Sequence, residues 1–145
     1  MKKIIPIGSD HAGFELKEIV INWLREHDFT PVDKGCFSTE SVDYPDFGHA
    51  VAIEVESGLA ELGIVICGSG NGINMSVNKH AGIRGALCWE PEIAALARQH
   101  NNANIVSIPA RFISSEKAIE IISIFIQTEF EGGRHQKRVE KITLN

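Results

Sequence analysis

Five short apolar runs alternate along the chain with segments of helical periodicity, and this alternation limits the possible folds more than any other feature of the sequence. Repeated strand–helix units build parallel sheets whose crossover helices cover the sheet faces. The predicted strands are Lys3–Gly8, Thr30–Asp33, Leu62–Cys67, Arg84–Cys88 and Asn104–Ile108. We therefore expect an α/β fold, a three-layer αβα sandwich with a doubly wound, five-stranded parallel sheet in the order 2-1-3-4-5.

Apolar residues at helical spacing fill the gaps between these runs. The clearest repeats are Leu16, Ile19, Val20, Trp23 and Leu24, and then Ala118, Ile121, Ile122, Phe125 and Ile126. Weaker repeats predict helices over residues 47–55 and 91–98. Ser114 or Ser115 is expected to cap the helix that contains Ala118 to Ile126. No long linker, internal repeat or low-complexity segment divides residues 1–145. One domain is expected, ending in a basic helical tail at about residues 130–145.

Charge and cysteine content exclude several classes of protein. A net charge of −5 argues against a nucleic-acid-binding domain, which is usually basic enough to replace phosphate counterions. Three cysteines at spacings of 31 and 21 residues match neither a metal motif nor a disulfide framework. The apolar run Ile4–Ile7 is too short for a signal sequence or a membrane span. We expect a cytoplasmic protein with reduced thiols and no membrane or nucleic-acid partner.

The stretch "CGSGNG" directly after the third predicted strand is the strongest candidate for a binding loop. Gly68, Gly70 and Gly72 would expose backbone amides at a helix N-terminus, an arrangement that suits a phosphate or a reaction oxyanion. The spacing is neither that of a dinucleotide fingerprint nor that of a P-loop. Cys67 would lie beside these amides, which favour a thiolate. A tight turn and a buried structural cysteine remain the simpler alternatives.

Three further groups of polar residues have both a functional and a structural interpretation. Asp10 and His11 follow the first strand, where a ligand site is expected, although Asp10 could simply cap a helix. His100 and its neighbour Asn101 end the fourth helix, where a polar or cationic residue also suits the helix dipole. Arg134 and Arg138 lie four residues apart in the tail, which places both on one helix face and suits them to grip a phosphate, although the segment could simply be a solvated charged tail.

Five motifs together resemble one known family over essentially the whole chain. They are "GSDHAGF", "DYPDFGHAVA", "ICGSGNGINMSVNKHAGIRGALC", "RQHNNANIV" and "FEGGRHQKRVEKI". In this order they resemble the type B ribose-5-phosphate isomerases. The resemblance implies interconversion of ribose 5-phosphate and ribulose 5-phosphate through an enediolate, in the non-oxidative pentose phosphate pathway, without a metal or redox cofactor. It also implies a homodimer, or a dimer of such dimers, with the active site at the subunit interface.

The resemblance also implies roles for individual residues. Cys67 matches the catalytic base, Ser69 a group that stabilises the enediolate oxygen, and Asp10 and His100 groups that bind and open the sugar ring. The implied substrate-binding residues are His11, Gly68, Gly70, Asn71, Gly72, Asn101, Arg111, Arg134, His135 and Arg138. His135 matches a position assigned to ring opening in some relatives, so the division of work between it and His100 stays open.

Three other functions remain as alternatives. The first is an isomerase of a hexose 6-phosphate, such as allose or galactose 6-phosphate, built on the same scaffold. The second is a phospholigand-binding module without catalysis, although a binding loop has no need of a thiol at Cys67. The third is a cysteine hydrolase in which His11 or His100 would partner the thiol.

Overall fold

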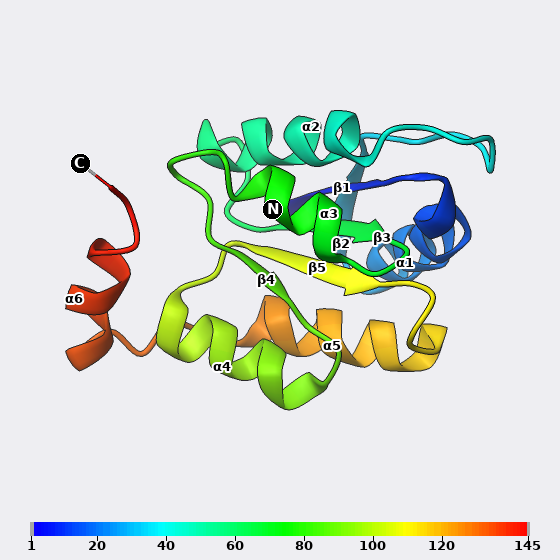
Figure 1. The fold of residues 1–145 in the computed structure, drawn as a ribbon. Helices are drawn as coiled ribbons and strands as arrows, with labels where there is room; N and C mark the ends of the chain where they lie inside the picture. The colour runs from blue at the N-terminus through cyan, green and yellow to red at the C-terminus, as the bar shows by residue number, and fades with distance from the viewer. Residues whose placement is uncertain (1, 145) are drawn as a thin grey trace.

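A five-stranded, all-parallel sheet forms the middle layer of the computed structural model, which describes residues 2–144 (Figure 1). Its strands are β1 (Lys3–Ser9), β2 (Phe29–Asp33), β3 (Gly63–Cys67), β4 (Gly85–Leu87) and β5 (Ile105–Pro109). One face is covered by α1 (Phe14–Glu26), α4 (Pro91–Asn101) and α5 (Ser115–Gln127), and the other by α2 (Tyr44–Glu56) and α3 (Asn71–Val77). The predicted doubly wound αβα sandwich is confirmed.

The strand order is β2-β1-β3-β5-β4, so the last two strands are exchanged relative to the predicted order. All five residues of β5 are buried, whereas the three residues of β4 are only partly buried. A strand that is apolar on both faces is most stable inside the sheet, and a short strand with partial cover is suited to an edge. Burial therefore places β5 between β3 and β4, although it follows β4 in the chain.

Helix α1 contains one charged residue that is as well buried as the apolar core. The Lys17 side chain is completely buried, and its Nζ atom lies 2.8 Å from Asp33 Oδ1 and 2.9 Å from Asp33 Oδ2. Asp33 Oδ1 also accepts a hydrogen bond of 2.9 Å from the amide of Gly35. A buried ammonium needs such a partner because desolvation would otherwise destabilise the charge. The ion pair thus links α1 to the end of β2, one of the two edge strands of the sheet.

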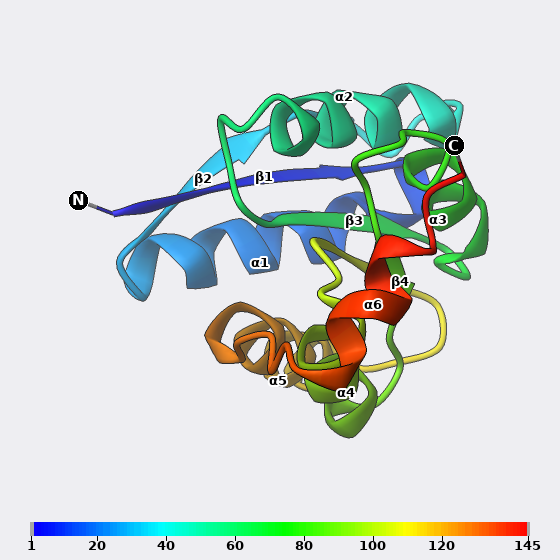
Figure 2. The same cartoon turned by 90° about the vertical axis from the view of Figure 1, so that its left-hand side faces the viewer.

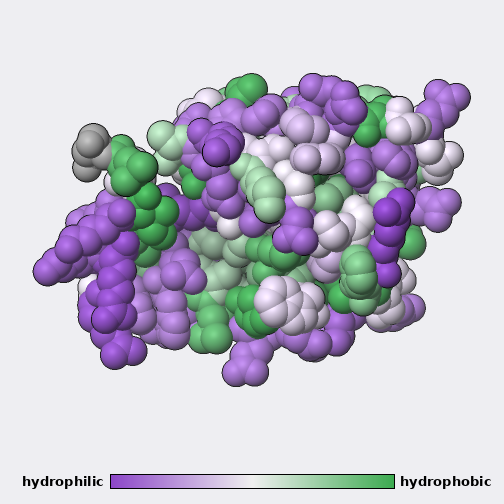
Figure 3. Space-filling model, viewed as in Figure 1, coloured by the Kyte–Doolittle hydropathy of each residue, from purple (hydrophilic) through white to green (hydrophobic). Residues whose placement is uncertain are grey.

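The basic tail forms the predicted helix, α6 (Arg134–Glu140), after a glycine with a positive φ angle of 54° at Gly133. Figure 2 shows α6 beside α4 at one end of the sandwich, and hydrophilic side chains cover it in Figure 3. The other helical segment is a short 3-10 turn, η1 (His11–Gly13), between β1 and α1. Within residues 2–144 no helix combines the length and the apolar character that a membrane crossing requires.

The Cys88 thiol gives the fold a measurable dependence on pH. Cys88 is completely buried at the end of β4, and burial raises the pKa of its thiol to about 12, whereas an exposed cysteine ionises near ~8.5. The unfolded chain therefore releases this proton at a lower pH than the folded chain does. We expect the free energy of unfolding to fall by about 1–2 kcal/mol between roughly pH 8 and pH 10 through this group alone.

Urea denaturation at both pH values, compared with Cys88→Ala, measures this contribution. The variant lacks the thiol, so its stability should fall less over the same range, and all other titrating groups cancel in the comparison. The same loss of stability in both proteins would show that Cys88 ionises equally easily in the folded and unfolded chains.

Candidate active site

The carboxyl ends of β1 and β3 meet at the point where the sheet reverses its winding, as the sequence predicts. Ser9 pairs with Ile66 in the parallel register, and the amide of Asp10 donates a hydrogen bond of 3.2 Å to the carbonyl of Ile66. A cavity of about 540 Å³ opens there. It is lined by Asp10, His11, Ala12, Tyr44, Cys67, Gly68, Ser69, Gly72, Arg111 and Phe112. The cavity thus brings together most of the residues predicted after the first and third strands, without Gly70 and Asn71.

Cys67 is the last residue of β3 and lines the cavity although only 5% of its surface is exposed. Its carbonyl accepts a hydrogen bond from the amide of Ala110 at 2.9 Å, and the carbonyl of Gly68 accepts one from the amide of Arg111 at 3.0 Å. These bonds attach the loop after β5 to the loop after β3. The thiol is therefore held at the base of a cavity with a guanidinium group nearby.

The glycine loop is shaped by close contacts that a side chain would prevent. Gly70 has a φ angle of +75°, and a Cβ atom there would lie 2.5 Å from Leu87 Cδ1. A Cβ atom at Gly68 would lie 3.1 Å from Arg111 Nη1, and one at Gly72 would lie 2.5 Å from the ring of Tyr44. Gly70 is therefore required by the turn, whereas a side chain at Gly68 or Gly72 would push Arg111 or Tyr44 out of its place in the cavity wall.

Ser69 and Asn71 form the exposed side of this loop. The Ser69 hydroxyl accepts a hydrogen bond of 3.3 Å from the amide of Asn71, the first residue of α3. The hydroxyl proton remains available to donate to a ligand oxygen. Because the loop leads directly into a helix N-terminus, the electrostatic field there also favours negative charge.

Asp10 and His11 have orientations that are fixed by the backbone. Asp10 is 7% exposed, and its Oδ1 atom accepts a hydrogen bond of 3.1 Å from the amide of Gly13, so the predicted capping role is real and coexists with a place in the cavity. His11 Nδ1 accepts a hydrogen bond of 3.1 Å from the amide of Val42. A ring nitrogen that accepts from an amide carries no proton, so the neutral ring carries its proton on Nε2.

Two aromatic residues in the cavity were not singled out from the sequence. Tyr44, the first residue of α2, covers Gly72, and Phe112 follows Arg111 in the loop after β5. Their side chains are exposed, at 40% and 74% respectively. The sequence offered one signal for Tyr44, which lies in the motif "DYPDFGHAVA", but nothing in its spacing indicates a contact with the glycine loop.

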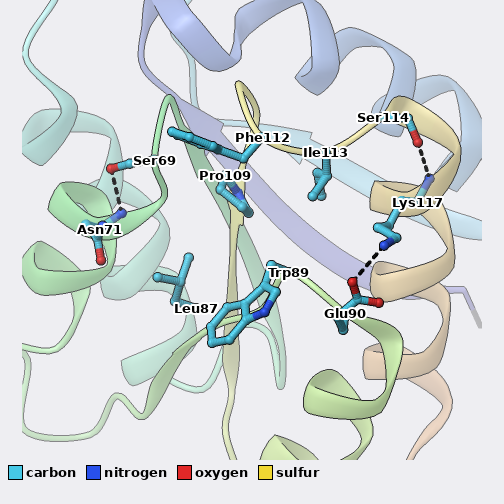
Figure 4. A pocket seen from close by; sticks show the side chains of 10 residues that line it. All are labelled: Ser69, Asn71, Leu87, Trp89, Glu90, Pro109, Phe112, Ile113, Ser114 and Lys117. Carbon is cyan, nitrogen blue, oxygen red and sulfur yellow. Dashed lines mark hydrogen bonds and ion pairs between the residues drawn. The ribbon is translucent and has the colours of Figure 1, made fainter.

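A second, more apolar cavity of about 590 Å³ adjoins the first and shares Ser69 and Phe112 with it (Figure 4). Leu87, Trp89 and Pro109 form its apolar walls, and apolar side chains gather over this part of β4 and β5 in Figure 3. At the far end, Lys117 Nζ lies 2.7 Å from Glu90 Oε1. In the observed order β5 lies between β3 and β4, so the residues after β4 line this second cavity and not the cavity that contains Asp10.

The remaining predicted site residues lie at the opposite end of the sheet from Cys67 (Figure 1). Helix α4 runs back from the carboxyl ends of the strands, so His100 and Asn101 in its last turn lie at the other edge, where α6 packs against α4. Arg134, His135 and Arg138 are on α6. The structure therefore divides the predicted site into two separate groups within one chain.

The second group is organised around two stacked imidazoles. The rings of His100 and His135 have centroids 4.3 Å apart and an interplanar angle of 15°. Glu131 Oε1 lies 3.7 Å from His135 Nε2 and 4.0 Å from His100 Nε2. The pKa of His135 is lowered, first by burial and then by the positive charge of His100, Arg134 and Arg138, against an opposing effect of Glu131. Exposed Arg134 and Arg138 add positive charge to the adjoining surface.

Comparisons with known proteins agree on one family. The chain matches the ribose/galactose isomerase family over residues 5–142. The ribose-5-phosphate isomerase B of Escherichia coli (strain K12) is 45% identical over 143 residues, which span 99% of this chain and 95% of the relative. A crystal structure of a ribose 5-phosphate isomerase from Thermotoga maritima is 47% identical, covers 99% of both chains and superposes with a TM-score of 0.96. The ribose-5-phosphate isomerase B of Mycoplasma genitalium with bound ribulose-5-phosphate is 43% identical, with a TM-score of 0.93 over 98% of this chain and 95% of that chain.

Proposed function

Because the chain belongs to the ribose/galactose isomerase family, we propose that it interconverts D-ribose 5-phosphate and D-ribulose 5-phosphate. The observation that carries the proposal is the cavity in which the thiol of Cys67, the hydroxyl of Ser69 and the carboxylate of Asp10 lie around the glycine loop. A relative of 43% identity holds ribulose-5-phosphate, the product of this reaction. An aldose–ketose isomerisation needs a base at carbon and donors for negative charge on oxygen, and this cavity contains both kinds of group.

In the proposed mechanism, the open-chain aldose lies with its C2 carbon beside Cys67. The thiolate removes the C2 proton, and the electron pair moves through C1 to the carbonyl oxygen, giving an enediolate. Ser69 and the amides of the glycine loop stabilise the negative charge on that oxygen. The thiol then returns a proton to C1, while the hydroxyl protons move between O1 and O2 with the help of polar groups such as Asp10. The base and the oxyanion donors both come from the turn after β3.

Phosphate binding and ring opening involve the second group of residues. In the proposed site, Arg134 and Arg138 grip the phosphate, His11 donates to it from Nε2, and His100 opens the furanose ring. His100 and the arginines lie at the far end of their own chain, so we propose a symmetric homodimer in which α4 and α6 of each protomer complete the cavity of the other. The three free thiols, Cys36, Cys67 and Cys88, favour a reducing compartment, and we propose the cytoplasm.

Turnover of ribose 5-phosphate by the purified protein, followed as ribulose 5-phosphate in the presence of a chelator, tests the proposed function. We expect steady turnover of the pentose phosphate and much slower turnover of allose 6-phosphate and galactose 6-phosphate. A reversed preference would assign the chain to hexose phosphates, a class that the family also includes by its description. Lack of turnover of all three sugars by folded protein would overturn the proposal.

Arg138→Ala should weaken binding of phosphorylated ligands by about 10–100-fold, because a charged hydrogen bond contributes roughly 1.5–3 kcal/mol. Inhibition by ribitol 5-phosphate and by ribitol, measured for both proteins, isolates the phosphate contribution. Ribitol, which has no phosphate, should bind both proteins equally. Lys137→Ala is the matched control, because Lys137 is an exposed cation next to Arg138 on the same helix, and adjacent helical residues do not face each other. Equal losses for the two ligands would mean that Arg138 acts through the structure of α6.

A further inference from the structure

The cluster of His100, Glu131 and His135 has a donor set that the isomerisation does not require. Each residue offers one ligand atom, and these atoms all lie within 4.8 Å of one another. Across residues 2–144 no other group of three histidine, cysteine or acidic side chains brings its ligand atoms together in this way. The three residues come from two segments far apart in the sequence, the last turn of α4 and the chain that leads into α6.

The distances in this cluster are close to those that a metal ion needs. Tetrahedral zinc, with bonds of about 2.0–2.1 Å to nitrogen and oxygen, holds its ligand atoms roughly 3.4 Å apart. The gaps from Glu131 Oε1 to His135 Nε2 and His100 Nε2 are 3.7 Å and 4.0 Å, so they need to close by about 0.3 Å and 0.6 Å. Metal binding also has to turn the rings out of their parallel stack. His100 and Glu131, with side chains 38% and 53% exposed, have room to move, whereas His135 is held in place by burial.

The backbone already holds these ligands near one another. The amide of Glu131 donates a hydrogen bond of 3.1 Å to the carbonyl of Gln99, which ties the segment before α6 to the end of α4. The amide of His135 donates one of 3.0 Å to the carbonyl of Gly132. Metal binding would therefore order few additional groups, and this lowers the entropic cost of forming the site.

The groups around the three ligand atoms include both some that favour a bound cation and some that oppose it. His100 lies in the last turn of α4, where the helix dipole favours a cation, and Glu131 adds a negative charge. Arg134 and Arg138 oppose a cation, and both are exposed to solvent, which screens their effect. Two imidazole nitrogens and one carboxylate oxygen match the ligands of zinc sites that keep a fourth position open.

We propose that His100, Glu131 and His135 form a binding site for a divalent transition metal, of which Zn²⁺ is the best match. The fourth position of the ion is taken by water. A metal bound at His100 occupies the nitrogen that would otherwise exchange a proton with the sugar ring. Zn²⁺ is therefore an inhibitor of the isomerase, and this second statement rests on the proposed function.

Calorimetric titration of the full chain with zinc chloride, in a buffer that does not bind zinc, tests the site without reference to activity. One Zn²⁺ ion should bind per chain. His100→Gln and Glu131→Gln should each weaken binding by roughly 100-fold or more, since loss of even an outer-shell partner of a metal ligand costs about 10–100-fold. Both side chains are partly exposed, so thermal unfolding of these variants should stay close to that of the parent.

His49→Gln is the matched control, because His49 also pairs with a second histidine. Its Nδ1 atom lies 2.7 Å from His80 Nε2, and His80 Nδ1 lies 3.4 Å from Glu56 Oε1. Zinc affinity should be unchanged in this variant. Absence of zinc binding by the parent protein would overturn the proposal. So would an affinity that survives both His100→Gln and Glu131→Gln, or one that falls in His49→Gln instead.

Inhibition is measured separately, as ribose 5-phosphate turnover against zinc concentration. We expect the zinc concentration for half inhibition to agree with the calorimetric dissociation constant, and to rise in Glu131→Gln by the same factor as that constant. If the protein binds zinc at this cluster but isomerises no sugar phosphate, the metal site is supported and the proposed function is rejected. If the protein isomerises the sugar and binds zinc at this cluster without loss of turnover, the metal site is supported and its inhibitory role is rejected.

Discussion

Cys67→Ala should abolish the isomerisation of ribose 5-phosphate and leave the fold intact. Removal of a general base costs about 10²–10⁴-fold in rate, and within the cavity Cys67 is the thiol beside the proposed oxyanion donors of the glycine loop. The side chain is small and lies at the end of a strand, so its loss leaves only a small void in the wall of an existing cavity. Turnover in the presence of a chelator and thermal unfolding by circular dichroism measure the two effects. Cys67→Ser should be inactive as well, since a hydroxyl is a far weaker base than a thiolate.

Cys88→Ala is the control for this experiment. Cys88 is also a buried cysteine and directly follows a strand, but burial keeps its thiol protonated over the whole range of the assay. This variant should retain most of the activity of the parent protein, at some cost in stability. Substantial activity in Cys67→Ala would remove Cys67 from the role of base and would leave the carboxylate of Asp10 as the candidate.

Two inactive variants should restore activity when they are combined in one dimer. In the proposed homodimer, Cys67→Ala damages the cavity half of each site, and the double variant Arg134→Ala, Arg138→Ala damages the half that the partner supplies. A hybrid dimer then has one site with both defects and one site with neither. With random pairing of equal amounts, about one quarter of the parent activity should return. Co-expression with two different affinity tags gives the hybrid in pure form for the assay.

Cys67→Ala combined with Ser69→Ala is the negative control, because both defects lie in the cavity half and every site of their hybrid stays damaged. If hybrids of Cys67→Ala with the double arginine variant form and remain inactive, then the site is not shared between protomers. In that case α6 would have to reach the cavity of its own chain, across the length of the sheet in Figure 1.

The helices and strands could be predicted because each follows from a local pattern. The apolar repeat from Leu16 to Leu24 predicts α1, and the buried run before Cys67 predicts β3, since each side chain must face either the core or the solvent. The position of β4 could not be found in this way. Its three residues differ little in character from an interior strand, and only the competition with the fully buried β5 sends it to the edge.

The sequence by itself determined an αβα sandwich. It also determined that Asp10 lies near the glycine loop, because the two parallel strands on either side of the point where the sheet reverses its winding end side by side. The tertiary structure decided which other residues join them. Tyr44 covers Gly72 only because α2 and α3 pack on the same face of the sheet. His100 and Arg138 lie far from Cys67 because α4 returns along the strands (Figure 1), a direction that no residue type or spacing records.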